Sequence, residues 1–278
     1  MSTVSVASPT TIKTRGEGDA DMTMTFLRGE GERMKPHGRR LSGTGRWAVA
    51  VAMLAGLGIG TVVQAAEGRV RVLVGSVDGR LGEPTAEKVN EPFAIDFDAQ
   101  GVLYGVEFTR GNRLFRSTQP IAEWPAEGEI TVEFVAGLFR QTKPGKDEAF
   151  QPEDEGRSPA QTLFNGMHDL AVSQNGRIFL ADTFHHCLRE LSGRQCHLSL
   201  LAGSGEPGDA GDGAGLAEAR FNEPYCCSLS PDGTHLLIAD IRNHRLRAID
   251  LESQKVATIA GNGDRGKPVD GAVATESP

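Results

Sequence analysis

Histidine and cysteine side chains gather in one short stretch of the chain, and both residue types bind zinc. His185, His186 and Cys187 are followed closely by Cys196 and His197. Imidazole nitrogens and thiolates are the ligands that Zn²⁺ prefers in structural sites. The stretch lacks the C-x-x-C and H-x-x-x-H spacings of familiar zinc sites. We therefore expect no zinc site here and keep Zn²⁺ as the less favoured alternative.

Acidic residues alternate with glycines in the segment GEPGDAGDGAG, residues 205–215. Carboxylates bind Ca²⁺, and Asp209 and Asp212 stand close together in this segment. The segment matches the calcium-loop pattern D-x-[DN]-x-[DN]-G poorly, and turn formation alone explains its composition. We expect no cofactor in the chain, with calcium or zinc as the alternatives.

Short strands must position these side chains, because the chain has 35 glycines and no convincing amphipathic helix after residue 66. The sequence FNGMHDLAVSQNGRIFLAD, residues 164–182, has a similar copy in FNEPYCCSLSPDGTHLLIAD, residues 221–240. A looser copy, NEPFAIDFDAQGVLYGVEF, covers residues 90–108. Self-similarity of this kind is the signature of a repeat architecture.

Each copy predicts four short strands, because its aliphatic runs are bounded by Gly, Asn, Asp or Pro. Tandem units of four strands are the pattern of β-propeller blades. The sequence therefore predicts an all-β fold of four-stranded antiparallel blades. The expected strands are 93–98, 102–108, 113–117 and 131–136; 168–173, 177–182, 187–191 and 197–202; and 225–230, 234–240, 245–250 and 255–260.

The third copy, residues 221–250, closely resembles an NHL repeat. The matching residues are Phe221, Asn222, Pro224, Asp232, Gly233, Ala239, Asp240, Asn243, His244, Leu246 and Arg247. The second copy fits through Asn165, Asp182 and His186, whereas the first is loose. This resemblance implies an NHL-type β-propeller and implies little about any particular activity.

The recurring polar residues are expected to be scaffold. Asp and Asn side chains at a tight corner hydrogen-bond nearby backbone N–H groups. We therefore predict a structural role for the repeat signature and expect no catalytic, cofactor-binding or metal-binding residue. The signature residues are Asn165, Asp182, His186, Asn222, Asp240, Asn243 and His244.

The amino-terminal part divides into two expected segments. Residues 1–33 are polar and are predicted to be a disordered extension. We suspect that the true initiator is Met34, in which case these residues come from a misassigned start. Residues 34–66 carry a basic start, an apolar run and small residues at the end, which is the pattern of a secretory signal peptide with a helical core. We expect an extracytoplasmic protein, secreted or periplasmic, with an uncleaved membrane anchor as the alternative.

Residues 67–278 are expected to form the propeller repeats. The repeats divide at about 69–137, 138–203 and 204–261, and residues 262–278 begin a fourth. Propellers have four to eight blades, so we expect an incomplete ring in a fragment of a longer protein.

A disulfide is the one covalent link that the sequence favours. Exported proteins often contain disulfides, and Cys187 and Cys196 flank the turn between two predicted neighbouring strands. We expect this pair as the candidate disulfide. Cys226 and Cys227 lie on one strand, where successive side chains point to opposite faces, so we expect no bond between them.

Charge and fold together favour a noncatalytic module that binds protein or carbohydrate partners. The chain has a net charge of −8, and its first 66 residues are basic, so the propeller part is more acidic still. An acidic surface disfavours nucleic-acid binding. The membrane is expected to be a partner only through the signal or anchor segment.

The alternative is a metal-dependent propeller enzyme of the lactonase, hydrolase or lyase type. Related propellers of this kind hold a metal in the central channel. The predicted innermost strands offer His168, Asp169, Asp96 and cysteines, which make no coherent catalytic set. A site of this type would therefore lie largely in blades outside the sequence.

Overall fold

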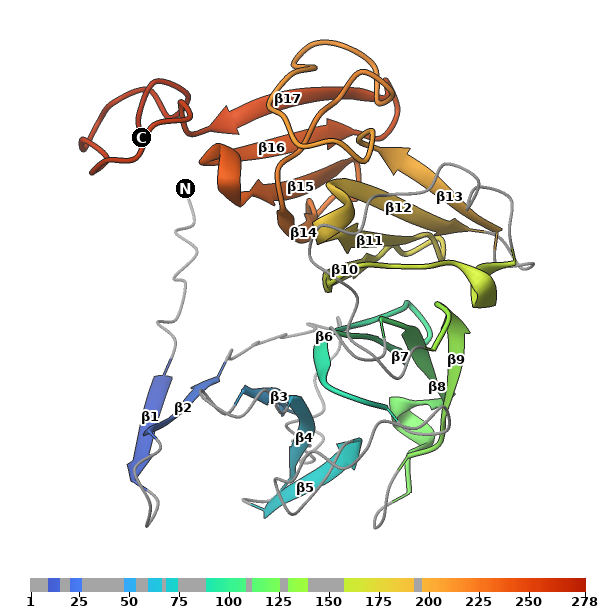
Figure 1. The fold of residues 1–278 in the computed structure, drawn as a ribbon. Coiled ribbons are helices and arrows are strands. Elements are labelled where there is room, and N and C mark those ends of the chain that lie inside the picture. The colour runs from blue at the N-terminus through green and yellow to red at the C-terminus, as the bar shows by residue number, and fades with distance from the viewer. Residues whose placement is uncertain are drawn as a thin grey trace, which may run out of the picture. The chain divides into compact units, whose positions relative to one another are not determined.

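The computed structural model describes residues 89–108, 112–125, 130–139, 158–192 and 197–278 with their side chains. It also gives the backbone of five strands before residue 75. The chain forms two compact units, residues 1–82 with 127–129, and residues 83–126 with 130–278 (Figure 1). The boundary between the two units therefore falls inside the predicted repeat region, 67–278.

The first unit contains two small antiparallel sheets. Strands β1 (Thr10–Arg15) and β2 (Asp21–Phe26) pair with each other. Strands β3 (Ala48–Met53), β4 (Gly60–Ala66) and β5 (Arg69–Val74) form the second sheet, in the order β3-β4-β5.

The structure has strands in the two segments for which the sequence predicts a disordered extension and a signal helix, and both expectations stay predictions. Strands β1 and β2 lie within residues 1–33, and β3 and β4 lie within residues 34–66. A short apolar run does not distinguish a helix from a strand by its periodicity, and the alternating Ala and Val of β3 suit a strand. The signal-peptide function and the position of the true start stay predictions. Among the described residues, none of the helices has the length and apolar character that a membrane span needs.

The second unit contains three four-stranded antiparallel sheets, each formed by strands consecutive in sequence (Figure 1). Blade 1 has β6 (Pro92–Phe97), β7 (Val102–Glu107), β8 (Leu114–Pro120) and β9 (Val132–Ala136). Blade 2 has β10 (Met167–Val172), β11 (Ile178–Asp182), β12 (Cys187–Ser192) and β13 (His197–Ala202). Blade 3 has β14 (Pro224–Leu229), β15 (His235–Asp240), β16 (Arg245–Asp250) and β17 (Lys255–Ala260).

The four-strand period predicted from the sequence is therefore confirmed, with most strand ends within one residue of the expected positions. Short 3₁₀ turns join the elements at Ile121–Glu123 (η1), Pro159–Gln161 (η3), Thr183–His185 (η4) and Ile241–Asn243 (η5). Turns η4 and η5 form the same corner in blades 2 and 3. Each is followed by a histidine in the left-handed conformation, His186 or His244.

The hydrophobic core lies between successive blades. One cluster joins blades 1 and 2 and includes Leu114, Leu170 and Leu180. A second cluster joins blades 2 and 3 and includes Phe179 and Ile238. Blade 2 therefore buries both faces, which explains why β11 is buried along its whole length. Packing of successive blades face to face is the propeller arrangement.

The first strand of each blade lies beside the first strand of the next, since β6 packs against β10 and β10 against β14. Carboxylates bridge these innermost strands. Asp96 Oδ2 accepts the backbone N–H of Val172 at 2.8 Å, and Asp169 Oδ2 accepts that of Cys227 at 3.0 Å. The innermost strands of neighbouring blades do not pair as a sheet. These bonds therefore satisfy backbone N–H groups that would otherwise lack an acceptor.

A second interblade bond starts from the left-handed residue at the corners of blades 1 and 2. Asn112 Oδ1 accepts the backbone N–H of Gly166 in the next blade at 2.8 Å. At the equivalent place His186 Nδ1 accepts the backbone N–H of Glu223 at 3.1 Å. The residue that fixes a blade corner thus also holds the entry of the following blade.

Replacing Asn112 with alanine is expected to reduce the unfolding free energy by about 1–3 kcal/mol, because the buried Gly166 N–H loses its acceptor. Urea unfolding followed by circular dichroism measures the change. Asn175→Ala, in an exposed turn, is the matched control and should change little. Equal effects of the two substitutions would show that the interblade bond contributes nothing.

Candidate binding site on the innermost strands

A β-bulge occurs at the same place in all three innermost strands. The pairing register shifts between Pro92 and Ala94, and equivalently on β10 and β14. The bulged residues are Phe93, His168 and Tyr225. Bulges re-aim a side chain and are frequent beside functional sites. The repeat therefore presents one ring-bearing side chain from each blade at the same level.

These three rings form an aromatic cluster with two further phenylalanines. The His168 ring lies 3.9 Å from the Tyr225 ring between centroids and 5.0 Å from that of Phe93, which meets it edge-on. Phe108, which directly follows β7, has its ring centroid 4.4 Å from that of His168, and the ring of Phe184, in η4, lies 5.6 Å from it. We call these five residues the aromatic cluster. Phe93 and Tyr225 are only partly buried, so the cluster reaches the surface.

The hydrogen bonds of His168 determine which ring nitrogen carries the proton. Nδ1 lies 2.8 Å from the carbonyl oxygen of Gly166 and 2.8 Å from Thr183 Oγ1. A carbonyl oxygen accepts only, and the Thr183 hydroxyl already donates to Pro224 O at 2.7 Å. Nδ1 therefore donates, and Nε2 is an acceptor. Burial lowers the pKa of His168 to about 4, so the ring is neutral at pH 7.

Two carboxylates stand on the same innermost strands. Asp169 accepts backbone N–H groups from Leu170 and Cys227, and Asp96 accepts them from Phe97 and Val172. Burial raises the pKa of Asp169 to about 6; these N–H groups oppose the rise and the nearby Asp96 adds to it. The two carboxylates are therefore close enough to repel each other.

Asp169 is expected to titrate with a midpoint near pH 6, against an ordinary pKa of 3.8. Because the folded state holds this proton more tightly than the unfolded state, the contribution of Asp169 to stability falls as pH rises from about 4 to about 6. The ¹³C resonance of the Asp169 carboxyl, assigned with Asp169→Asn, measures the midpoint. A midpoint below 4.5 would contradict the burial of this group.

The cysteines of the innermost strand β14 point in different directions. Cys226 is exposed and Cys227 is buried, and the two form no disulfide with each other. Burial raises the pKa of both thiols, with further contributions from Asp169. Neither thiol is therefore activated as a nucleophile. In the candidate disulfide, Cys187 is buried at the start of β12, and Cys196 lies outside the described residues, so the bond stays a prediction.

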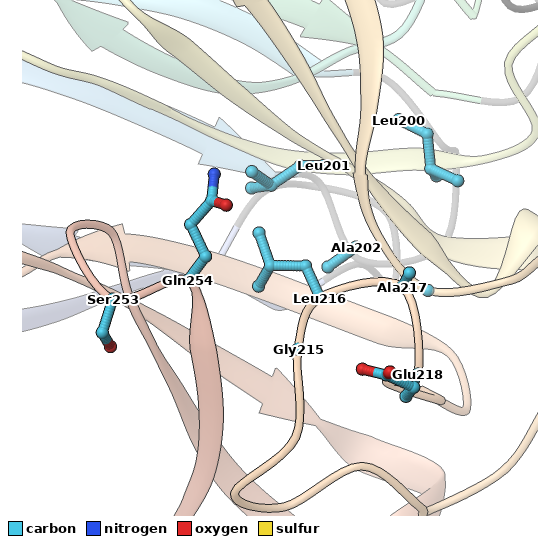
Figure 2. A pocket seen from close by; sticks show the side chains of 10 residues that line it. Leu200, Leu201, Ala202, Gly215, Leu216, Ala217, Glu218, Ser253 and Gln254 are labelled. Atoms are coloured by element: carbon cyan, nitrogen blue, oxygen red, sulfur yellow. The ribbon is translucent and has the colours of Figure 1, made fainter.

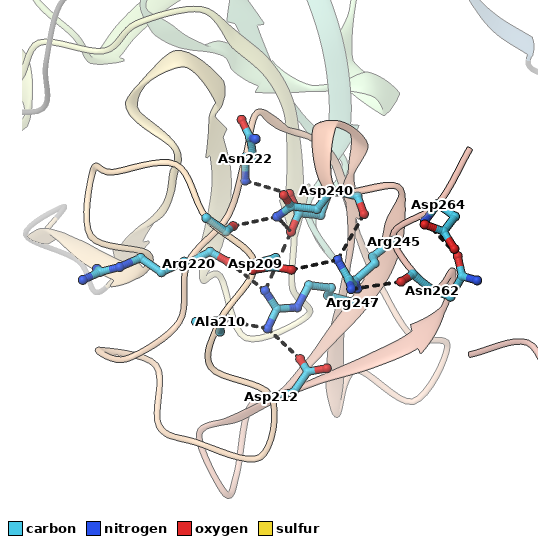
Figure 3. A network of polar contacts seen from close by, with 12 residues as sticks. Asp209, Ala210, Asp212, Arg220, Asn222, Asp240, Arg245, Arg247, Asn262 and Asp264 are labelled. Carbon is cyan, nitrogen blue, oxygen red and sulfur yellow. Dashed lines mark hydrogen bonds and ion pairs between the residues drawn. The ribbon is translucent and has the colours of Figure 1, made fainter. Parts of the chain in front are cut away.

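Most of the repeat signature lies inside the blade corners. In blade 3, Asp240 accepts the backbone N–H of Asn222 at 2.8 Å and the Asn243 amide at 2.8 Å (Figure 3). Asn243 also donates to Gly208 O, which lies in the segment before β14. Burial raises the pKa of Asp240, and its hydrogen bonds oppose the rise.

A fully buried arginine completes this corner. Arg247 lies 3.7 Å from Asp240 as an ion pair and donates to the carbonyl oxygens of Arg220 and Ala210. It also bonds Asp212 at 2.6 Å, as Figure 3 shows. The arginine thus fastens the segment before β14 to the blade.

Blades 2 and 1 build the same corner with different residues. Asp182 accepts the backbone N–H of Asn165 and pairs with His185 at 2.9 Å and with Arg189 at 3.2 Å. Burial works to raise the pKa of Asp182, but His185 and Arg189 outweigh it and lower that pKa. In blade 1, Glu107 pairs with Arg113 and accepts the Asn90 N–H. Of the predicted signature, the asparagines before the innermost strands therefore meet the corner acid, and Asn243 joins Asp240. His186 instead bonds the next blade, and His244 accepts a hydrogen bond from Arg265.

The candidate metal ligands have protein partners. His185 is bonded to Asp182, and His186 to the Glu223 N–H. Asp209 and Asp212 pair with Arg245 and Arg247. In the part of the chain that the structure describes, no group of three or more His, Cys, Asp or Glu side chains is arranged to hold a metal ion.

A shallow groove lies on the outer side of blades 2 and 3. It has a volume of about 490 Å³. Figure 2 shows its lining, which comes from β13, from residues 215–218 and from the turn before β17. Glu218 is its only ionisable lining residue, so the groove offers little that would orient a ligand.

Comparison with known proteins finds partial relatives, some of which are named for NHL repeats. No family model matches the chain. It is 34% identical over 97 residues to Protein SUPPRESSOR OF QUENCHING 1, chloroplastic, of Arabidopsis thaliana, covering 35% of this chain and 9% of that protein. It is 26% identical over 112 residues to NHL repeat-containing protein 2 of Homo sapiens, covering 39% of this chain and 15% of the relative.

The chain therefore matches only a small part of these relatives. Among solved structures, an auxiliary nutrient binding protein from Bacteroides ovatus superposes with a TM-score of 0.50 and 13% identity. The superposition covers 83% of this chain and 42% of that one, and at this identity it supports the fold alone. The four-strand period, the corner signature and these relatives agree, and together they support an NHL-repeat family and a propeller fold for this chain.

Proposed function

We propose that this propeller is a noncatalytic binding module whose ligand lies on the innermost strands. The observation that carries the proposal is the repeated bulge, which brings Phe93, His168 and Tyr225 together at one level. Scaffold residues alone would not need a side chain re-aimed from every blade. The remaining polar groups of this face, Asp96 and Asp169, are partly buried acceptors.

The competing proposal is a metal-dependent propeller enzyme. The neighbouring carboxylates Asp96 and Asp169 favour it, since paired carboxylates bind metals or share a proton. Against it, each carboxylate already accepts two backbone N–H groups, and the described residues hold no cluster of three metal ligands. The thiol of Cys226, with its raised pKa, is a poor nucleophile. Binding without chemistry is the simpler use of this face.

The class of partner and the location are also proposals. A soluble ligand or a protein or carbohydrate partner suits an acidic propeller better than a nucleic acid does. Export rests on the sequence pattern of residues 34–66. A bacterial auxiliary nutrient binding protein has a similar fold, which is compatible with a role in binding. Sequencing the amino terminus of the native protein tests export. A native protein that begins at Met34 or earlier would show that the signal segment is not cleaved.

Ligand-observed NMR of the full chain with a library of small neutral, cationic and anionic compounds tests the binding proposal. We expect some compounds to bind and to be recovered unchanged after prolonged incubation. Turnover of lactones or esters that is abolished by a chelator would support the enzyme instead. Absence of any binding would remove the support that the aromatic cluster gives.

A further inference from the structure

Blade 3 has one face that packs on blade 2 and one that does not. Leu236 and Ile238 of β15 point toward blade 2 and belong to the core cluster that joins the two blades. Successive side chains of a strand point to opposite faces, so the residues that alternate with them turn away from blade 2. We call this second side the free face of blade 3, the last of the three described blades (Figure 1). Its central and outer residues are Leu237, Ala239, Leu246, Ala248, Ala257 and Ile259.

The free face exposes large apolar side chains. Leu246 is 48% exposed and Ile259 is 41% exposed. Among the described residues, five of the six exposed large apolar side chains lie in blade 3 or in the segment after it, and the sixth is Leu138 of blade 1. Apolar side chains that gather on one surface in this way mark a site of interaction with another protein.

The matching face of blade 2 already forms an interblade contact. Leu188 belongs to the core cluster between blades 2 and 3, and Leu201 packs against that cluster. Leu246 and Ile259 hold the same places in blade 3, because both blades pair their last two strands in one register with the same shift. The free face thus repeats a surface that packs on a β-sheet one blade earlier.

The strand register gives the centre of the free face a chequered pattern of large and small side chains. Leu237 stands opposite Ala248 across β15 and β16, and Ala239 stands opposite Leu246. Each leucine therefore has an alanine beside it across the strands and another two positions along its own strand. The alanines form the hollows of this pattern, since Ala248 is only 7% exposed.

This pattern is complementary to itself. A two-fold axis that lies in the contact plane, along the strands and between β15 and β16, exchanges the two strands. Leu237 of one copy then lies over Ala248 of the other, and Leu246 lies over Ala239. The four residues carry no charge, so the contact buries no unpaired ion.

We propose that the free face of blade 3 binds the free face of a second copy of this chain, which forms a two-fold symmetric dimer. Sheets pack face to face in this way in β-sandwiches. A different partner would have to present a matching pattern, whereas a second copy supplies it by itself. This contact is separate from the proposed ligand site, and neither depends on the other.

The size of the free face sets the expected strength of the dimer. Four strands about 4.8 Å apart, each with about six residues, give a footprint of roughly 19 by 20 Å. This area is about half of the roughly 800 Å² that each partner buries in a standard interface. We therefore expect a reversible dimer with a dissociation constant in the micromolar range.

Sedimentation velocity of the full chain, at protein concentrations up to about 100 μM, tests the proposal. A reducing agent is present because Cys226 is exposed on the same face. We expect a monomer at low concentration that converts to a dimer as the concentration rises. A monomer at every concentration would overturn the proposal. Growth beyond the dimer would also overturn it, because an isologous contact closes at two copies.

Three variants locate the contact. Leu246→Glu and Ile259→Glu should each weaken the dimer by at least about tenfold, because each buries a charge without a partner. Leu138→Glu, which changes an equally exposed leucine of blade 1, is the matched control and should leave the dimer unchanged. Circular dichroism identifies the folded variants, and either face variant decides the test if the other fails to fold. A dimer of wild-type affinity in a folded face variant would overturn the placement.

Isotope-filtered NMR of a mixed sample, half ¹³C-labelled and half unlabelled, tests the symmetry directly. We expect intermolecular methyl contacts between Leu237 and Ala248 and between Leu246 and Ala239. Intermolecular contacts that join other parts of the chain, without these pairs, would overturn the two-fold arrangement.

Discussion

Replacing Asp240 with alanine is expected to lower the unfolding free energy by about 3–5 kcal/mol. The reason is that the buried Arg247 then loses the buried carboxylate with which it forms an ion pair. The Asn222 N–H and the Asn243 amide also lose their acceptor. Asp212 remains bonded to Arg247, but it is 46% exposed and compensates only in part.

Urea unfolding of the full chain, followed by circular dichroism, measures this loss. Asp264→Ala serves as the control, since that side chain is exposed and its substitution should stay within about 0.5 kcal/mol. A second variant, Arg247→Met with Asp240→Asn, removes both charges and should recover part of the loss. If Asp240→Ala behaves like the control, the corner signature is not the scaffold that we describe.

The second large effect is expected at Gly203, the glycine that follows β13. Its φ angle is +93°, and an added Cβ would lie 2.7 Å from the carbonyl oxygen of His186 and 2.9 Å from Cys187 Cα. Both neighbours are backbone atoms of the adjacent strand and do not move easily. Gly203→Ala should therefore cost about 3 kcal/mol or more, from the left-handed conformation and the backbone clash together.

Gly176→Ala separates the two causes. Gly176 also has a positive φ, +82°, but an added Cβ would meet nothing within 4 Å. We expect this variant to lose only about 1–2 kcal/mol, which is the cost of the conformation alone. Thermal unfolding of both variants under one condition checks the difference. A Gly176 variant as unstable as the Gly203 variant would show that steric contact does not matter there.

The repeat made most of the propeller part predictable. Short aliphatic runs between turn residues define strands whatever their neighbours are, so β13 and β17 matched their expected bounds of 197–202 and 255–260. The glycine after the last strand of each blade could be recognised because it recurs at the same position of the repeat. Its reason, contact with the backbone of the preceding strand, depends on packing that the sequence does not display.

The binding face was harder to predict. His168 and Asp169 stood out as residue types but made no recognisable set, because a bulge on each innermost strand brings the rings together. A signal was available, since Phe93, His168 and Tyr225 each lie three positions after the repeated asparagine. The interblade bonds of Asn112 and His186 were hidden for a similar reason: they join residues of different blades.

Two sets of residues have separate roles. The signature residues maintain the blade corners, whereas residues of the innermost strands, which differ between blades, contact the ligand. The most direct test is a backbone amide NMR map of the full chain titrated with the tightest compound from the library. We predict shifts concentrated at residues 93–97, 168–172 and 225–228, with little change at Asp240 and Asn243. Shifts concentrated at the corner residues or along the groove near Leu216, with the innermost strands unchanged, would contradict it.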